Sequence, residues 1–130
     1  VAAHLHSRGI LHGDLYGHNI LHDGQGSALL GDFGAASFYL AGSLLGASLE
    51  RLEVRAFGCL LEELMAHCEL SVSLRHELTV LMHDCLQEVV TARPDFASVY
   101  ARLRRMAGSA CEVVSTPVGE IVETDSVLTG

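Results

Sequence analysis

Three oxygen-bearing side chains near the start of the chain could carry out chemistry together. Asp14 and Asn19 lie in the segment HGDLYGHN, and Asp32 follows in GDFG. A carboxylate can accept or orient the proton of an attacking hydroxyl group. Carboxylate and amide oxygens also bind Mg²⁺, whose charge can stabilise a phosphoryl group during transfer. The three residues could therefore bring a base and two metal-binding oxygens to one point.

A β-hairpin is expected to position these side chains. Residues 19–22 indicate a short strand, residues 23–26 a turn, and residues 27–30 a second strand. An Asp-Gly pair between two apolar runs is a strong short-range signal for a hairpin. Such a hairpin would fold the chain back so that Asp32 comes to lie beside Asn19.

Helices are expected on both sides of this hairpin. Residues 1–9 indicate the end of a helix, with Gly9 as a suitable cap, and residues 35–48 indicate a loop with at most one helical turn. From Leu49 onward, apolar residues recur at a spacing of four. That stripe predicts a helix buried on most sides, and it consists of Leu52, Ala56, Leu60 and Leu64.

Two more helices complete the predicted fold. One begins with Ser73 as its N-cap, and the other follows Pro94-Asp95 and ends near Gly108. Residues 108–130 contain no basic residue and show no helical period, so we expect a disordered tail. The patterns together predict a fold that is mainly α with a small β-hairpin.

Composition limits the possible functions of the 130 residues. A net charge of −8 argues against nucleic-acid binding. No apolar run is long enough to span a membrane, and the first residues lack the layout of a signal peptide. We therefore expect a cytoplasmic protein without membrane association, and this chain to be part of a longer one. The four cysteines show no metal-binding spacing and are expected to be buried free thiols.

Four sequence motifs follow one another in a characteristic order. LHSRGILHGDLYGHNIL looks like a catalytic loop with its following strand, and LLGDFGAAS looks like a metal-binding strand and turn. LERLEVRAFGCLLEELM is similar to a large central helix, and ARPDF is similar to an Arg-Pro signature near the end of a lobe. Over residues 1–106 the chain therefore resembles the C-terminal lobe of a eukaryotic-type protein kinase, a fold of the α+β superfamily.

This resemblance implies a role for each candidate residue. Asp14 would be the catalytic base, and Asn19 and Asp32 would bind Mg²⁺ and thereby ATP. Leu21 would lie under the adenine ring. The resemblance also implies that Phe33 packs behind the site, that Glu53 anchors the backbone of the catalytic loop, and that Glu50 pairs with Arg93.

The same resemblance implies a division of the chain and of the activity. Residues 1–107 would be a partial kinase domain, which in a longer parent transfers phosphate from ATP to Ser, Thr or Tyr hydroxyls of a protein substrate. The glycine-rich loop and the phosphate-binding lysine belong to an N-terminal lobe, which would act in cis. All eight basic residues here are arginines, so no lysine is present. We therefore expect the chain alone to be inactive.

Departures from the family pattern leave other functions open. Gly13 stands where the family has arginine, and Tyr16 stands where it has a catalytic-loop lysine. A pseudokinase or truncated binding module is one alternative. A small-molecule phosphotransferase of the choline or aminoglycoside type is another, because that class also has His-Gly-Asp-Leu loops. A zinc site is a further possibility, since five of the eight histidines precede Asp23.

Overall fold

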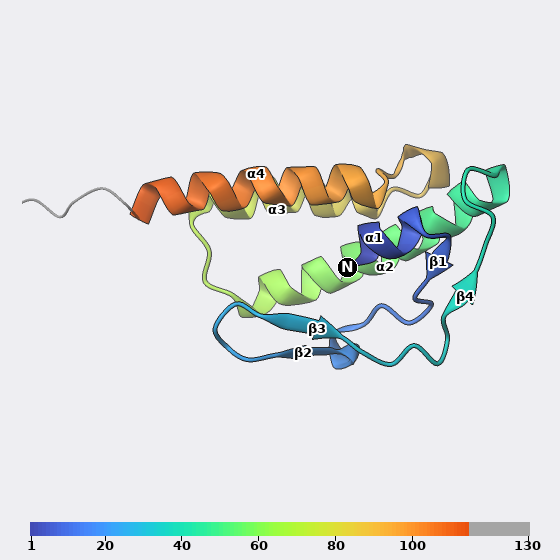
Figure 1. Cartoon of the computed structure of the whole chain (residues 1–130). Coiled ribbons are helices and arrows are strands. Elements are labelled where there is room, and N and C mark those ends of the chain that lie inside the picture. The colour runs from blue at the N-terminus through green and yellow to red at the C-terminus, as the bar shows by residue number, and fades with distance from the viewer. Residues whose placement is uncertain (115–130) are drawn as a thin grey trace, which may run out of the picture.

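The computed structural model describes residues 1–114, which are mainly helical with two small antiparallel sheets (Figure 1). The helices are α1 Ala2–Ser7, α2 Leu44–His67, α3 Val72–Cys85 and α4 Phe96–Val114. The strands are β1 Ile10–Leu11, β2 Ile20–His22, β3 Ala28–Leu30 and β4 Ser37–Phe38. Two single 3₁₀ turns, η1 Gly17–Asn19 and η2 Val90–Ala92, complete the set.

The predicted hairpin is confirmed. Strands β2 and β3 pair antiparallel, with Ile20 opposite Leu30 and Leu21 opposite Leu29. The turn is held by Asp23, whose Oδ1 accepts hydrogen bonds from the backbone N–H groups of Gln25 and Ser27. The Asp-Gly pair therefore forms the predicted turn, in which the aspartate side chain bonds to nearby backbone N–H groups.

The second sheet was not predicted. Residues 35–48 were expected to form a loop, but β4 pairs antiparallel with β1, with Ile10 opposite Phe38. The backbone N–H of Tyr39 extends this pairing by donating to the carbonyl of Gly9. Gly9 has a φ of +68°, and a Cβ there would lie 2.7 Å from the Tyr39 carbonyl oxygen. The pairing of β4 with β1 therefore depends on glycine at position 9. The small residues of segment 35–48 gave no sign of this pairing.

Helix α2 begins earlier than predicted and is less buried. Ser43 caps it by accepting a hydrogen bond from the N–H of Gly46, so the helix starts at Leu44 rather than at Leu49. The predicted stripe is wrong in part, because Leu52 is 56% exposed and Leu64 is 49% exposed. The buried face instead includes Val54, Gly58, Leu61 and Met65.

The last two helices also differ from the prediction at their ends. Ser71, not Ser73, caps α3 through a bond from the N–H of Leu74. Asp95 accepts a bond from the N–H of Ser98 in the first turn of α4. Helix α4 continues through Gly108 to Val114, so its predicted end near Gly108 was too early. Of the predicted disordered tail, residues 115–130 lie outside the described part of the chain.

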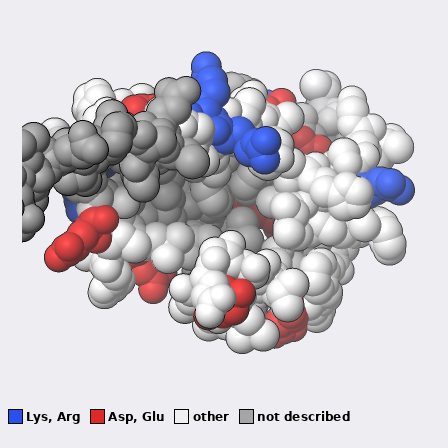
Figure 2. Space-filling model, turned by 60° about the vertical axis from the view of Figure 1, so that its left-hand side comes forward, with Lys and Arg blue, Asp and Glu red and all other residues white. Residues whose placement is uncertain are grey.

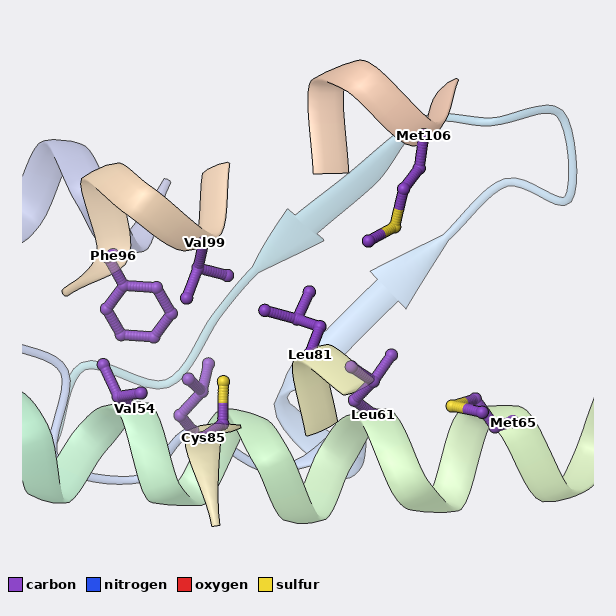
Figure 3. Close-up of a cluster of buried hydrophobic side chains, with 9 residues drawn as sticks. Val54, Leu61, Met65, Leu81, Cys85, Phe96, Val99 and Met106 are labelled. Atoms are coloured by element: carbon purple, nitrogen blue, oxygen red, sulfur yellow. The ribbon is translucent and has the colours of Figure 1, made fainter. Parts of the chain in front are cut away.

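The core lies between α2, α3 and α4. Figure 3 shows Val54, Leu61 and Met65 on α2 pointing toward Phe96, Val99 and Met106 on α4. Leu81 and Cys85 of α3 fill the space between them and have no exposed surface. Burial raises the pKa of the Cys85 thiol to about 11. Helix α3 approaches α2 closely at Gly58, where an added Cβ would lie 2.8 Å from a Leu86 methyl carbon.

One face of the molecule carries few charged residues among those that the structure describes (Figure 2). Figure 2 shows one face on which uncharged residues cover most of the described surface and charged ones are scattered.

Cys59 and Cys68 are exposed, so the expectation of buried cysteines fails for these two. Within residues 1–114, no helix combines the length and the apolar character that crossing a membrane requires.

Candidate active site

The loop that carries Asp14 is tied to α2 by Glu53. The Oε1 atom of Glu53 accepts a hydrogen bond of 3.1 Å from the backbone N–H of His12, and Oε2 accepts one of 2.8 Å from Gly13. The ring Nε2 of His6 in α1 lies 3.0 Å from Oε1. The expected anchoring of the loop by Glu53 is therefore present in the structure.

Glu53 stays ionised because its donors outweigh its burial. Burial by itself would raise the pKa of this carboxyl group. The hydrogen bonds from His6 and from the loop amides of Gly13 and His12 act in the opposite direction, and the net pKa lies below the ordinary value. The anion thus has enough donors to be stable inside the protein.

His12 connects the loop to the strand that precedes Asp32. It has no exposed surface, and its Nδ1 accepts a bond from the backbone N–H of Asp14 at 3.2 Å. The hydrogen on Nε2 is therefore free to donate to the carbonyl of Gly31, 2.8 Å away. Phe33 packs edge-on against the His12 ring, with centroids 4.8 Å apart, as expected for a residue behind the site.

Asp14 and Asn19 are brought together. The side-chain Nδ2 of Asn19 donates to the backbone carbonyl of Asp14 at 2.7 Å and to its carboxylate Oδ2 at 2.9 Å. Asn19 is buried, while the Asp14 side chain is 34% exposed. Because both donor hydrogens of Asn19 are used, its Oδ1 is left to face away from Asp14.

Asp32 follows β3 after one residue, Gly31, which bonds to Asn19. The N–H of Gly31 donates to the carbonyl of Asn19 at 2.8 Å, which fixes the chain just before Asp32. Asp32 has a φ of +52°, the one positive value among the described non-glycine residues. Its carboxylate is exposed, and Oδ1 accepts a bond from the N–H of Gly34 at 3.2 Å.

Leu21 lies on the outer face of the hairpin. It is 68% exposed, and its cross-strand partner Leu29 is 71% exposed. Together they form one wall of a shallow, mostly apolar pocket above the turn. A flat apolar surface of this kind could accept a ring, and it lies on the strand that continues from Asn19.

Tyr16 and His18 lie next to Asp14 and were not given a joint role from the sequence. Their rings stack at 5.6 Å with an angle of 17° between the planes. The Nε2 atom of His18 lies 3.7 Å from Oδ2 of Asp14. Both side chains are largely exposed, so they border the opening of the site.

Gly13 has a structural reason to lack a side chain. Its φ is +82°, and an added Cβ would lie 2.3 Å from the carbonyl oxygen of Ala35. The segment after Asp32 therefore passes directly over Gly13. An arginine at this position, as in the resembled family, would require that segment to move.

The predicted ion pair between Glu50 and Arg93 is not among the salt bridges of the described residues. Arg93 is buried and donates instead to the carbonyls of Gln87 and Arg51, at 2.7 and 3.1 Å. Glu50 accepts a short hydrogen bond from the hydroxyl of Tyr39. Each group thus has a different partner from the one that the family resemblance implied.

Tyr39 was not predicted to support the site. Its hydroxyl oxygen lies 3.0 Å from the backbone carbonyl of His6 and close to the Glu50 carboxylate. Burial, the bond to Glu50 and the nearby negative charges together raise the pKa of Tyr39 above its usual range. The residue links the segment after Asp32 to α1 and α2. The signal available in the sequence was its place between Phe38 and Leu40, since alternate residues of an extended segment point to opposite sides.

The described side chains do not form a zinc site. Among the side chains that the structure describes, no three His, Cys, Asp or Glu lie close enough to hold a metal ion. The oxygens of Asn19 and Asp32 are of the type that Mg²⁺ prefers, and Mg²⁺ is usually bound by one or two protein groups with water and substrate phosphates. The donor set therefore fits magnesium better than zinc.

Comparisons with known proteins give one partial match. Over 36 residues the chain is 53% identical to a protein of Arabidopsis thaliana described as a "Probable serine/threonine-protein kinase". These 36 residues are therefore similar in sequence to a probable kinase. The match covers 28% of the chain and only 5% of the Arabidopsis protein. No protein-family model matches the chain.

Proposed function

We propose that the chain contributes the base and the metal-binding half of an ATP-dependent phosphotransferase site that acts on protein hydroxyl groups. The observation that carries this proposal is the double hydrogen bond from Asn19 to Asp14 in a loop anchored by Glu53. These bonds fix the position of the candidate base, Asp14, relative to the candidate metal ligand, Asn19. The partial match to a probable serine/threonine-protein kinase supports the same chemistry.

The roles of the residues follow from their contacts. The Oδ1 atom of Asn19 and the exposed carboxylate of Asp32 would hold Mg²⁺. Asp14 would orient the substrate hydroxyl and accept its proton, and the bond from Asn19 would hold its carboxylate in one orientation. When bound, Mg-ATP supplies the phosphoryl group and neutralises charge that develops during transfer. Leu21 and Leu29 would contact the adenine ring.

The remaining parts of such a site would come from elsewhere. The chain contains no lysine to bind the phosphates. An N-terminal lobe acting in cis would have to supply that lysine and a glycine-rich loop. We therefore propose that these 130 residues alone do not catalyse transfer. The chain alone should accordingly show no thermal shift with Mg-ATP.

The test uses the longer protein that this proposal calls for, with its N-terminal lobe. Asp32→Asn should abolish transfer of labelled phosphate from Mg-ATP to a protein substrate, because it removes the charge that holds the metal. Asp84→Asn is the matched control, since Asp84 is an aspartate on α3 that bonds to Arg102, away from the candidate site. The control should retain activity.

Two outcomes would contradict the proposal. Unchanged turnover in Asp32→Asn would remove Asp32 from the site, and a wild-type full protein without transfer activity would favour a non-catalytic module. Labelling of a small amino alcohol or aminoglycoside in place of protein would instead identify the substrate as a small molecule. In that case the proposed phosphotransferase activity would be correct, but the proposed protein acceptor would be wrong.

A further inference from the structure

A run of exposed apolar residues follows the candidate site in the chain. Phe38 is 87% exposed, Leu40 77%, Leu44 92% and Leu45 71%. They come from β4, from the connection after it and from the first turn of α2. No Asp, Glu, Lys or Arg occurs between Asp32 and Glu50. We call these four residues the uncharged surface.

The backbone beneath the uncharged surface is firmly held. Tyr39, which lies between Phe38 and Leu40, turns inward and bonds to His6 and Glu50. Ser43 caps α2 and also donates to the carbonyl of Leu40 at 2.7 Å. The side chains of Tyr39 and Ser43 thus bond within the protein while the large apolar side chains of the segment face solvent. Their exposure is a property of the fold rather than of a loose loop.

The extent of this surface is that of an interface. With side-chain areas on the order of 150–200 Å² for large apolar residues, the four exposed fractions add up to roughly 500–650 Å² per copy. That is near the upper end of the largest apolar patches on monomers, about 300–600 Å². Small exposed neighbours such as Ala41 and Ala47 would extend it toward the ~800 Å² per partner of a stable complex.

Strand β4 adds an unpaired backbone edge. The N–H of Tyr39 bonds to Gly9, and Ile10 lies opposite Phe38, so Ile10 and Phe38 form a non-hydrogen-bonded pair. The backbone N–H and C=O of Phe38 therefore point away from β1, toward the outer edge. An exposed edge of this kind pairs readily with a further strand.

We propose that the uncharged surface is the interface of a symmetric dimer of this chain, in which the β4 edges of two copies pair antiparallel. Such a pairing is self-complementary, because each Phe38 supplies the donor and the acceptor that the other requires. Charge restricts where two copies can meet. Each copy carries a net charge of −8, and this surface lets two copies meet without bringing carboxylates together.

The experiment measures self-association of the 130-residue chain by sedimentation velocity over a wide concentration range. The wild type should form a species of twice the chain mass of 13.9 kDa. Leu44→Glu combined with Leu45→Glu should weaken association at least about a hundredfold, because each glutamate would bury a charge. Negative charge in the first turn of a helix is favourable, so this variant should keep its fold, as far-UV circular dichroism can verify.

A matched control and a variant of the β4 edge distinguish this interface from nonspecific association. Val72→Glu changes a residue that is 89% exposed in the first turn of α3, outside the uncharged surface, and it should dimerise like the wild type. Phe38→Pro removes the outward N–H but not the bond from Tyr39 to Gly9, and it should be monomeric. A monomeric wild type would overturn the proposal. So would a dimer that survives the double glutamate variant, or one that Val72→Glu disrupts equally.

Discussion

At the scale of single residues, one carboxylate joins three parts of the chain. Glu53 on α2 accepts hydrogen bonds from His6 in α1 and from the loop amides of His12 and Gly13. The donors lie far from Glu53 in the sequence, so these hydrogen bonds exist only in the folded chain. The low pKa of Glu53 in the folded state therefore contributes to the free energy of folding.

The pH dependence of this contribution has a definite sign. Because folding lowers the pKa of Glu53 below its reference value of 4.5, its contribution is fully present above that value and is lost as the pH falls through the folded-state pKa. Glu53→Gln should reduce the free energy of unfolding by about 1.5–3 kcal/mol at pH 7. The difference from the wild type should shrink below about pH 4.5, as urea denaturation at a series of pH values can measure.

The control for this prediction is Glu62→Gln on the same helix. Glu62 is exposed, so its replacement should leave the curve close to that of the wild type. Asp23 and Asp95 also have lowered pKa values, and they contribute an acid-induced loss that wild type and variants share. A difference between Glu53→Gln and wild type that stays constant from pH 7 to pH 3 would contradict the assigned role.

At the scale of elements, the packing of α2 against α3 depends on Gly58. An added Cβ would lie 2.8 and 2.9 Å from two Leu86 carbons and 3.0 Å from the Cβ of Cys85. Gly58→Ala should therefore destabilise the protein by about 1–3 kcal/mol. This cost outweighs the gain of up to ~1 kcal/mol that alanine brings to a helix interior.

Gly108 in α4 provides the opposite case. Nothing lies within 4 Å of a Cβ at this position, so Gly108→Ala should stabilise the protein by about 0.5–1 kcal/mol. Both variants can be compared by chemical denaturation under the same conditions. A stabilising Gly58→Ala would show that the two helices can separate there at no cost, which would contradict the close packing.

Sequence patterns predicted the elements whose signals are local. The hairpin followed from Asp23 and its glycine neighbour, and the three long helices followed from apolar spacing. The face of α2 that is buried could not be predicted in the same way. Leu52 and Leu64 fit a helical stripe as well as Leu61 does, and only the positions of α3 and α4 decide which side is covered.

At the scale of the whole molecule, the candidate site was partly predictable. Family resemblance pointed to Glu53 as the loop anchor, and the structure contains those bonds. It also implied a pairing of Glu50 with Arg93, which the structure does not contain. That difference arises because Tyr39 reaches Glu50 through the pairing of β4 with β1, a contact between distant segments that short sequence motifs do not encode.

The anchoring of the loop by Glu53 also has a consequence for its dynamics. The amide hydrogens of His12 and Gly13 can exchange with solvent only when their bonds to Glu53 open, and Glu53 lies on a helix of the core. Both amides should exchange as slowly as those of α2, whereas exposed turn amides such as that of Gly24 should exchange fast. Fast exchange at both loop amides would contradict this. Slow exchange would mean that the loop is preorganised, with Asp14 held in place before any nucleotide binds.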